Sequence, residues 1–387
     1  MLENYVITNG TIYTETGVIE HGHIEVAHGK IKHVSKGDYQ GQLPTIDAQF
    51  NHILPGFIDI HIHGGYGEDA MDASAKGLTH LATSLLAEGT TSFLATTMTQ
   101  SDDNVTQALK VIAQYIDNQD DNSAAEIVGI HLEGPFISED KVGAQNPKYV
   151  QRPSIDKIKY FQQLAQQNIK IITFAPEVAG ASDTLSALHD DIIFSIGHTT
   201  ATFDEVNEAQ QLGARHVTHL YNAGTPFEHR QPGLFGAAWT NDRLRTELIV
   251  DGIHAHPAAV NIALRQKGIE RFYLITDAMR AKGMPDGTYD LGGQDVIVRG
   301  SEARLASGAL AGSILKMNEG LKNLMSFTQR TLNELWRVTS LNQALALNLA
   351  HRKGSIQHGK DADLVIVNSN IEVLTTIKKG TVHEFNK

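Results

Sequence analysis

The sequence predicts an α/β protein in which a (β/α)8 barrel of the TIM type is joined to a small β-sandwich domain built from both ends of the chain. Two observations carry this prediction. Strand-like and helix-like segments alternate through the middle of the chain over roughly 220 residues, which is close to the usual size of such a barrel. Short strands without helices occupy residues 4–54 and return after residue 354. With 387 residues, the chain is long enough for a large barrel and a second, smaller domain.

The middle region contains eight candidate strands, the number that closes a barrel. They cover residues 57–63, 91–97, 126–133, 169–177, 191–198, 215–222, 245–251 and 271–277. Helix-like segments at 75–88, 102–117, 155–167, 202–212 and 257–267 indicate a parallel sheet with helical crossovers. Residues 279–312 are glycine-rich and include a hairpin-like piece at 292–305, which could cover part of the barrel mouth. Helical patterns resume at 313–327 and 332–350.

The small domain is predicted to contain residues 1–54 and 355–387, and the barrel domain residues 55–354. Strand-like pieces at 5–13, 22–27 and 30–34 are followed, at the other end of the chain, by pieces at 354–367, 373–377 and 381–385. We expect turns at the glycines between the first strands, including Gly10 and Gly22. The two chain ends should therefore contribute strands to one small sheet.

The composition excludes several classes of function. The formal net charge is −12 and there is no basic run, so the chain lacks the electrostatic footprint of a nucleic-acid-binding protein. Cysteine is absent, which rules out disulfides and thiolate nucleophiles and leaves His, Asp and Glu to hold any metal. The first residues resemble no signal peptide and no run of 18 apolar residues occurs, so we expect a cytoplasmic protein with no membrane contact.

Residues 55–65, PGFIDIHIHGG, have a polar side chain at every second position. In an extended strand Asp59, His61 and His63 share one face, and Ile60 and Ile62 share the other. The two histidines at the strand exit could form half of a metal site. They could also be ordinary polar residues of a half-exposed sheet, because a two-residue motif is short. Residues further along the chain decide between these interpretations.

Functional residues of such barrels gather at the C-terminal ends of the strands, where the loops form an open mouth. The predicted strand exits place six residues there, namely His61, His63, Glu133, His198, His219 and Asp277. Imidazole and carboxylate ligands suit a divalent ion and leave zinc, iron, manganese, nickel or cobalt open. Glu133, His198 and His219 could hold one ion, and the histidine pair a second, with Glu133 as the bridge.

Asp277 could simply cap the turn after its strand. Beside a metal site, a carboxylate can instead accept the proton of an attacking water and later pass it to a leaving amine. With the other five residues in place, we favour this catalytic role for Asp277.

Longer motifs resemble those of a known family. They are PGFIDIHIHG at 55–64, HLEGPF at 131–136, GH at 197–198, THLYNA at 218–223, RQPG at 230–233, DGIH at 251–254, TDA at 276–278 and LAGS at 310–313. Along nearly its whole length the sequence resembles the amidohydrolase superfamily and, within it, the family of N-acetylglucosamine-6-phosphate deacetylases. Many amidohydrolases bridge two metals with a carboxylated lysine, whereas this family has a glutamate after the third strand, a position that Glu133 matches.

The resemblance implies a reaction and a cofactor. The reaction is hydrolysis of the acetamide of N-acetylglucosamine 6-phosphate to glucosamine 6-phosphate and acetate, a step in amino-sugar catabolism and cell-wall sugar recycling. Some family members have glutamine and asparagine in place of the histidine pair and work with one metal. The pair His61 and His63 therefore implies one or two divalent ions per subunit, with Glu133, His198 and His219 at the main position and Asp277 as the general acid/base.

The resemblance also implies how the substrate binds. His254 would reach a sugar hydroxyl or the acetamide carbonyl, while the backbone of Asn222 and Ala223 would bind the phosphate together with Arg230, whose guanidinium offers paired donors. In the family the corresponding arginine reaches the active site of the neighbouring subunit, which implies a homodimer; taken alone, Arg230 could equally be a solvated loop charge. Gln145 stands where many members have a histidine against the substrate, and its amide can bind a sugar hydroxyl but cannot carry charge.

Two other interpretations stay open. The chain could be a different amidohydrolase, such as a cyclic amide hydrolase or a nucleobase deaminase, although Arg230 and the Asn222–Ala223 context favour a phosphorylated substrate. It could also be a catalytically silent scaffold of the same fold. The complete set of metal ligands, together with Asp277, argues against the scaffold.

Overall fold

The predicted barrel is present in the computed structural model, which describes residues 3–120 and 122–385. Its eight strands pair in chain order and run parallel. The strands are β6 (Phe57–Ile62), β9 (Thr90–Thr97), β10 (Glu126–Glu133), β11 (Ile169–Phe174), β12 (Ile193–Ile196), β13 (His216–Val217), β14 (Arg245–Ile249) and β15 (Phe272–Ile275). All eight predicted strands are therefore confirmed, although β6 and the strands β11 to β15 end earlier than the sequence pattern indicates.

The barrel closes between its first and last strands, at the end that carries the predicted site. The backbone N–H of Asp277 donates to the carbonyl of His61 at 2.8 Å, and the N–H of His63 donates to Ala278 at 2.9 Å. A buried hydrogen bond from the Thr276 hydroxyl to Asp59 lies beside them, at 2.5 Å. The closure therefore brings Asp277 beside His61 and His63, which are far from it in sequence.

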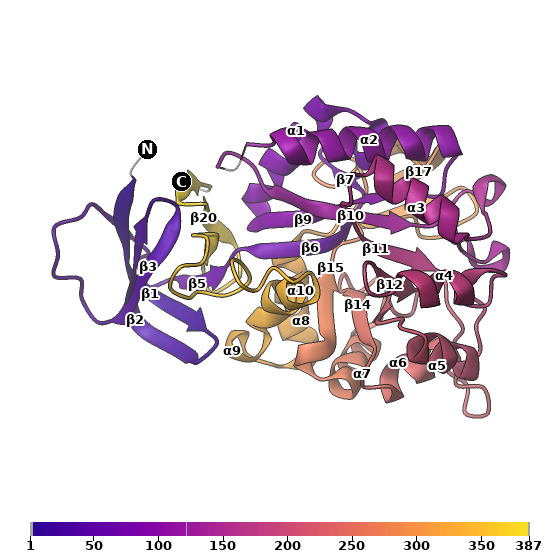
Figure 1. Cartoon of the computed structure of the whole chain (residues 1–387). Coiled ribbons are helices and arrows are strands. Elements are labelled where there is room, and N and C mark those ends of the chain that lie inside the picture. The colour runs from indigo at the N-terminus through magenta and orange to yellow at the C-terminus, as the bar shows by residue number, and fades with distance from the viewer. Residues whose placement is uncertain (1–2, 121, 386–387) are drawn as a thin grey trace.

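The five predicted crossover helices are confirmed. They are α1 (Ala75–Leu85), α2 (Asp102–Asn118), α3 (Ile155–Leu164), α5 (Phe203–Gln211) and α7 (Pro257–Lys267). The first four begin at Ser74, Ser101, Ser154 and Thr202, whose side chains accept a backbone N–H of the first turn. The helices lie on the outside of the barrel strands (Figure 1). Buried side chains such as Leu81, on α1, belong to the hydrophobic core that the helices share with the barrel.

Three helical regions differ from the prediction. The segments α4 (Ala181–Leu188) and α6 (Gly233–Thr240) were not expected, and neither has a side-chain cap at its start. The predicted helix at 332–350 is divided into α9 (Leu332–Leu335), η6 (Trp336–Thr339) and α10 (Leu341–Ala346), and the non-helical backbone of Ser340 (φ −151°, ψ −67°) separates η6 from α10. The helix α8 (Met317–Thr328) lies within the helical pattern expected at 313–327, except for its last residue.

A mixed sheet of eight strands forms the β-sandwich domain predicted from both chain ends (Figure 1). Its strands are β1 (Asn4–Thr14), β2 (Gly17–Ala27), β3 (Lys30–Lys36), β4 (Thr45–Asp47), β5 (His52–Pro55), β19 (Leu364–Val367), β20 (Val373–Lys378) and β21 (Thr381–Glu384). The two ends meet where β19 pairs with β5. The residue boundaries of the two domains stay a prediction.

The expected turns at Gly10 and Gly22 are wrong, because the two glycines face each other inside the paired strands β1 and β2. A Cβ on Gly10 would lie 2.2 Å from Ile53 Cδ1, and one on Gly22 would lie 2.7 Å from Ile12 Cδ1. These glycines therefore allow side chains to pack closely across the sheet.

The glycine-rich segment after β15 forms a three-stranded sheet of β16 (Gly287–Leu291), β17 (Gln294–Arg299) and β18 (Glu302–Leu305). Met98 and Met279 pack with its buried side chains Leu291 and Val296. Leu291 also lines the pocket at the barrel mouth, so this insertion covers part of the mouth as expected.

The remaining elements are short. They are β7 (Gly64–Gly65), β8 (Glu68–Asp69) and the 3-10 helices η1 (Ala70–Asp72), η2 (Leu86–Glu88), η3 (Glu139–Lys141), η4 (Pro147–Tyr149) and η5 (Ile269–Arg271). Among the helices of the described residues, none is long and apolar enough to cross a membrane.

Candidate active site

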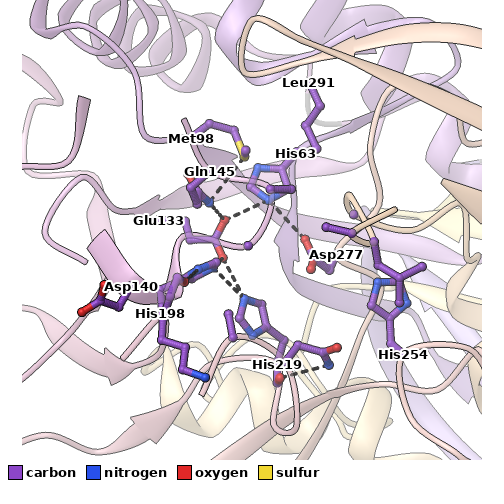
Figure 2. Close-up of a pocket in the computed structure, with 18 residues that line it drawn as sticks. His63, Met98, Glu133, Asp140, Gln145, His198, His219, His254, Asp277 and Leu291 are labelled. Carbon is purple, nitrogen blue, oxygen red and sulfur yellow. Dashed lines mark hydrogen bonds and ion pairs between the residues drawn. The ribbon is translucent and has the colours of Figure 1, made fainter. Parts of the chain in front are cut away.

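A cavity of about 360 Å³ opens at the C-terminal ends of the barrel strands (Figure 2). His61 lies beneath it with no exposed surface. Arg230 is exposed on the loop before α6 and does not line the cavity. The other nine predicted site residues line it, namely His63, Glu133, Gln145, His198, His219, Asn222, Ala223, His254 and Asp277.

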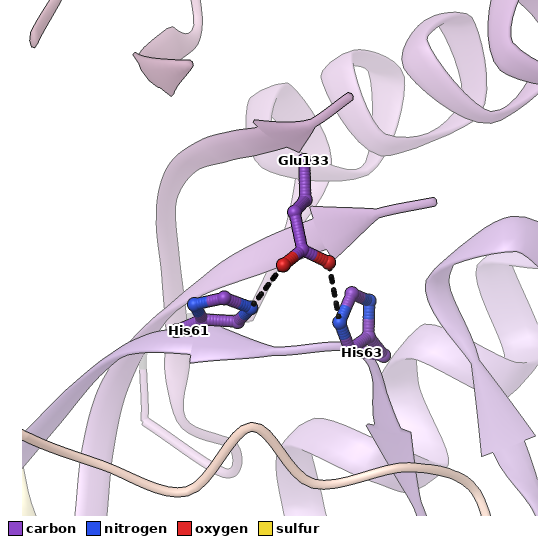
Figure 3. A group of neighbouring side chains, drawn as sticks. All are labelled: His61, His63 and Glu133. Atoms are coloured by element: carbon purple, nitrogen blue, oxygen red, sulfur yellow. Dashed lines mark ion pairs between the residues drawn. The ribbon is translucent and has the colours of Figure 1, made fainter. Parts of the chain in front are cut away.

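The carboxylate of Glu133, at the end of β10, lies at the centre of a ring of imidazoles. Its Oε1 atom is 3.0 Å from His219 Nε2 and 3.2 Å from His198 Nε2. Its Oε2 atom is 3.1 Å from His63 Nε2, while His61 Nε2 lies 3.4 Å from Oε1 (Figure 3). All four imidazoles therefore direct their Nε2 atoms at one carboxylate.

The outer nitrogens of His198 and His63 indicate that their inner nitrogens are available to a metal ion. Nδ1 of His198 lies 2.9 Å from the carbonyl of Lys141, and Nδ1 of His63 lies 3.2 Å from that of Thr96. A carbonyl only accepts, so Nδ1 carries the hydrogen and Nε2 of the neutral ring keeps its lone pair for a ligand. His61 Nε2 is buried without a hydrogen-bond partner.

Two groups of possible metal ligands share Glu133. Within each group, the ligand atoms lie within 4.8 Å of one another. One set adds His198 and His219, and the other adds His61 and His63. Nitrogen and carboxylate ligands of this kind fit a divalent transition metal. The predicted residues therefore form groups that could hold a metal.

The imidazoles and carboxylates of the site shift one another's pKa values. Burial would raise the pKa of Glu133, but His61, His198 and His219 outweigh burial and hold it well below its usual range. In the same way His61 and His63 lower the pKa of Asp277 to about 2, against the effect of burial. Burial would lower the pKa of His63, but Asp277 and Glu133 raise it to about 10. Both carboxylates are therefore ionised at neutral pH, and an arriving cation must displace the imidazole proton.

Three of the site residues lie in the left-handed backbone region just after their strands. The φ angles are 49° for His198, 29° for His219 and 48° for Asp277. Such a conformation costs a non-glycine residue roughly 1–3 kcal/mol and is concentrated at functional sites. It turns the chain at the strand exit and explains why β12, β13 and β15 end before these residues.

Asp277 lies across the cavity from Glu133, with Oδ1 3.2 Å from His63 Nε2 and 3.4 Å from His61 Nε2 (Figure 2). Its side chain is 11% exposed, on the cavity side, whereas His61 has no exposed side-chain surface. Asp277 can therefore contact both a ligand in the cavity and the histidine pair.

The predicted substrate-binding residues have different surroundings. His254 lines the cavity, and its Nδ1 lies 2.6 Å from Asp251 Oδ2, which orients Nε2 as the free ring nitrogen. The backbone N–H of Asn222 already donates to the carbonyl of His219 at 3.0 Å. Ala223 has a left-handed backbone (φ 49°) at the cavity wall.

Gln145 is almost fully buried, and its amide contacts the protein rather than open space. Its Oε1 accepts the backbone N–H of Thr99 at 2.7 Å, and its Nε2 donates to Glu133 Oε2 at 2.6 Å. The structure thus brings Gln145 against the central carboxylate.

Sequence reasoning missed several residues that support the site. Glu247, on β14, lies 2.9 Å from His61 Nδ1, and Asp251 orients His254. His131 lies beneath the site, 3.0 Å from the carbonyl of Ile60, and burial lowers its pKa well below the usual value, so that it is neutral. A charged residue in the middle of an apolar strand is a signal that could have revealed Glu247, and the DGIH motif contains Asp251.

Comparison with known proteins defines the class of protein. The amidohydrolase family profile matches residues 52–383, and the chain belongs to the amidohydrolase family.

Individual relatives with a named activity match nearly the whole chain. The chain is 46% identical to an N-acetylglucosamine-6-phosphate deacetylase from Bacillus subtilis, over 100% of this chain and 99% of the relative. An N-acetylgalactosamine-6-phosphate deacetylase from Escherichia coli O157:H7 is 34% identical, over 98% of this chain and all of that protein (100%). The crystal structure of an N-acetylglucosamine-6-phosphate deacetylase from Pasteurella multocida is 31% identical and superposes with a TM-score of 0.93, covering 99% of this chain and 100% of that one.

Proposed function

We propose that the protein is a metal-dependent hydrolase that removes the acetyl group of N-acetylglucosamine 6-phosphate, giving glucosamine 6-phosphate and acetate. The observation that carries this proposal is the position of Asp277, which contacts His61 and His63 and faces the Glu133 carboxylate across the cavity. The full-length similarity to a deacetylase of this substrate supports it.

The main metal position is formed by Glu133, His198 and His219, and a second position by His61 and His63, with Glu133 shared between them. A divalent ion held there lowers the pKa of water and polarises the attacked carbonyl. The same ligands accept zinc, iron, manganese, cobalt or nickel. One or two ions per subunit fit this ligand set.

The chain's own residues move the protons and bind the sugar. Asp277, ionised at neutral pH, accepts a proton from the attacking water at its Oδ1 atom. His254 donates its Nδ1 hydrogen to Asp251, so Nε2 of the neutral ring is free to accept a hydrogen bond from a sugar hydroxyl. Asp277 then returns its proton to the amine nitrogen as the C–N bond breaks. No residue of the chain becomes acylated.

The substrate is a phosphorylated amino sugar, and the stereochemistry at C4 is the open point, because one relative is named for the galactosamine epimer. The decisive assay measures acetate release from the two sugar phosphates and from unphosphorylated N-acetylglucosamine, with and without a chelator. We expect the highest kcat/KM for N-acetylglucosamine 6-phosphate, loss with chelator, and recovery on adding a divalent ion. Turnover of a cyclic amide alone would contradict the proposal.

Within this assay Asp277→Asn should reduce turnover by about 10²–10⁴-fold, because the general acid/base is lost. Metal content and sugar binding should stay near those of the unmodified protein. The control is Asp190→Asn, which changes an aspartate that is 86% exposed. Near-normal turnover of Asp277→Asn would show that the assignment is wrong.

We also propose that the protein is a homodimer in which Arg230 reaches the phosphate in the neighbouring active site. Arg230 is exposed on the same loop as Phe227, which is 50% exposed and packs on Trp239 with ring centroids 5.2 Å apart. Mixing Arg230→Ala with Asp277→Asn subunits should restore activity that neither variant has alone. Arg243→Ala, which changes another exposed arginine, is the control. Failure to complement in a proven mixed dimer would overturn the role of Arg230. The cytoplasmic location stays a prediction.

A further inference from the structure

The orientation of the Gln145 amide follows from its neighbours. A backbone N–H can only donate, so the atom of Gln145 that lies 2.7 Å from Thr99 N must be the oxygen. The amide nitrogen therefore faces Glu133 Oε2, at 2.6 Å, and also lies 3.6 Å from Met98 Sδ. Both hydrogens of this NH2 group thus have partners in the protein, which leaves none for a sugar hydroxyl.

The contact with Gln145 divides the two oxygens of Glu133 between different neighbours. Oε1 lies near His198 and His219, with His61 Nε2 3.4 Å away, whereas Oε2 lies near His63 and receives the Gln145 hydrogen bond. Among the described residues, Gln145 is the one partner of this carboxylate that is not a histidine of the metal groups. In Figure 2 the Gln145 amide and the His63 ring approach the Glu133 carboxylate from different sides.

We propose that Gln145 is a positioning residue for the metal bridge: by holding Glu133 Oε2 toward His63, it sets the affinity of the second metal position rather than contacting the sugar. The proposal rests on the metal-dependent function proposed above. Residues that hydrogen-bond a metal ligand in this way commonly change metal affinity by about 10–100-fold when they are replaced. Because one lone pair of Oε2 accepts from Gln145, another remains for an ion.

The test is a metal titration of the purified full-length protein with manganese or cobalt, followed by elemental analysis and by acetate release at each metal concentration. Gln145→Met keeps the side-chain size but removes the donor to Glu133. We expect the second ion to bind about 10–100-fold more weakly, the first ion to remain, and kcat to recover at high metal concentration while KM for the sugar stays within about threefold.

Two reference variants calibrate the titration. The double variant His61→Gln, His63→Asn removes the second position and should bind one ion with partial activity. Met98→Leu changes the other partner of the Gln145 amide, leaves the hydrogen bond to Glu133 in place, and should keep the second ion. Should Gln145→Met fail to fold, Gln145→Asn retains an amide but shortens the side chain, and a weaker second ion is expected again.

The outcomes separate this role from others. A raised KM with unchanged metal binding would make Gln145 a sugar contact and overturn the proposal. Equal loss of both ions, or an unmodified protein that binds one ion at every concentration, would overturn it as well. If the unmodified protein binds two ions but releases no acetate, the proposed function fails while the role of Gln145 is still decided by the titration.

Discussion

Strand β10 begins and ends with a glutamate, and the two carboxylates lie in buried clusters of different character. Glu126 lies 2.9 Å from Lys353 and 3.4 Å from Lys378, and it also pairs with Arg352. Glu133, at the other end, has imidazoles as partners. In both clusters, carboxylate or histidine ligand atoms lie close enough together to hold a metal ion. The difference shows that the type of cationic partner, rather than the spacing of carboxylates, separates a structural cluster from a candidate catalytic one.

At the Glu126 end the chain itself supplies the cations, as lysine and arginine side chains. Lys378, on β20, and Lys353 are fully or almost fully buried, and both contact Asp363. Burial would raise the pKa of Asp363, but the two lysines lower it to about 2. Lysine and arginine side chains therefore pair with the carboxylates of this group, and the ion pairs tie the small sheet to the base of the barrel. At the Glu133 end the partners are imidazoles, which can lose a proton and bind a metal instead.

The largest effect is expected from Glu133→Gln. Without the shared carboxylate, metal content should fall and turnover should drop by about 10³-fold or more, equivalent to several kcal/mol of transition-state stabilisation. The free energy of unfolding of the metal-free protein should change less than in Glu126→Gln, because the imidazoles left beside the amide can release their protons near neutral pH, whereas a lysine releases its proton far less readily. Elemental analysis, the acetate assay and urea unfolding test this. Full metal content in the variant would show that the two ends of β10 do not differ as described.

Glu126→Gln should have the opposite effect, because it should lower the stability of the protein and leave turnover almost unchanged. Leaving Lys353 and Lys378 buried with one carboxylate fewer should cost about 3–5 kcal/mol of unfolding free energy, while turnover per folded molecule stays within about twofold. Urea unfolding at neutral pH measures the loss. The matched control is Glu302→Gln, whose ion pair with Arg304 is more than 40% exposed on both sides and should contribute about 0–1 kcal/mol. Equal losses in the two variants would contradict the structural role of Glu126.

The smallest of these effects is a dependence on pH. The pKa of Asp363 is about 2 in the folded protein, below the value of about 4 in an unfolded chain. Ionised Asp363 therefore contributes fully to the free energy of unfolding above pH 4. This contribution, roughly 2–3 kcal/mol in total, is lost as the pH falls toward 2. Asp363→Asn should unfold with a flatter dependence on pH between 5 and 2 than the unmodified protein. Asp190→Asn, at an exposed position, should keep the original slope, and parallel curves for all three proteins would refute the assignment.

Regular patterns made much of the fold predictable. The eight strands and five crossover helices followed from apolar runs and helical periodicity, and four of those helices carry a serine or threonine cap at their start. The helices α4 and α6 could not be predicted in the same way. Gly180 and Pro232 at their starts offer no side-chain cap, and α6, with sequence GLFGAAWT, has no polar face to reveal a helical period.

The chain sequence by itself determined the residue types and strand ends from which a divalent-metal site could be predicted, because side chains at the exits of parallel strands converge at one end of a barrel. The tertiary structure decided what surrounds each carboxylate. Lys353 and Lys378 reach Glu126 from more than two hundred residues away, Glu247 reaches His61, and Gln145 turns its amide toward Glu133 because Thr99 N–H takes the oxygen. Such contacts depend on which loops and strands the closed barrel brings together, and no local sequence pattern contains that information.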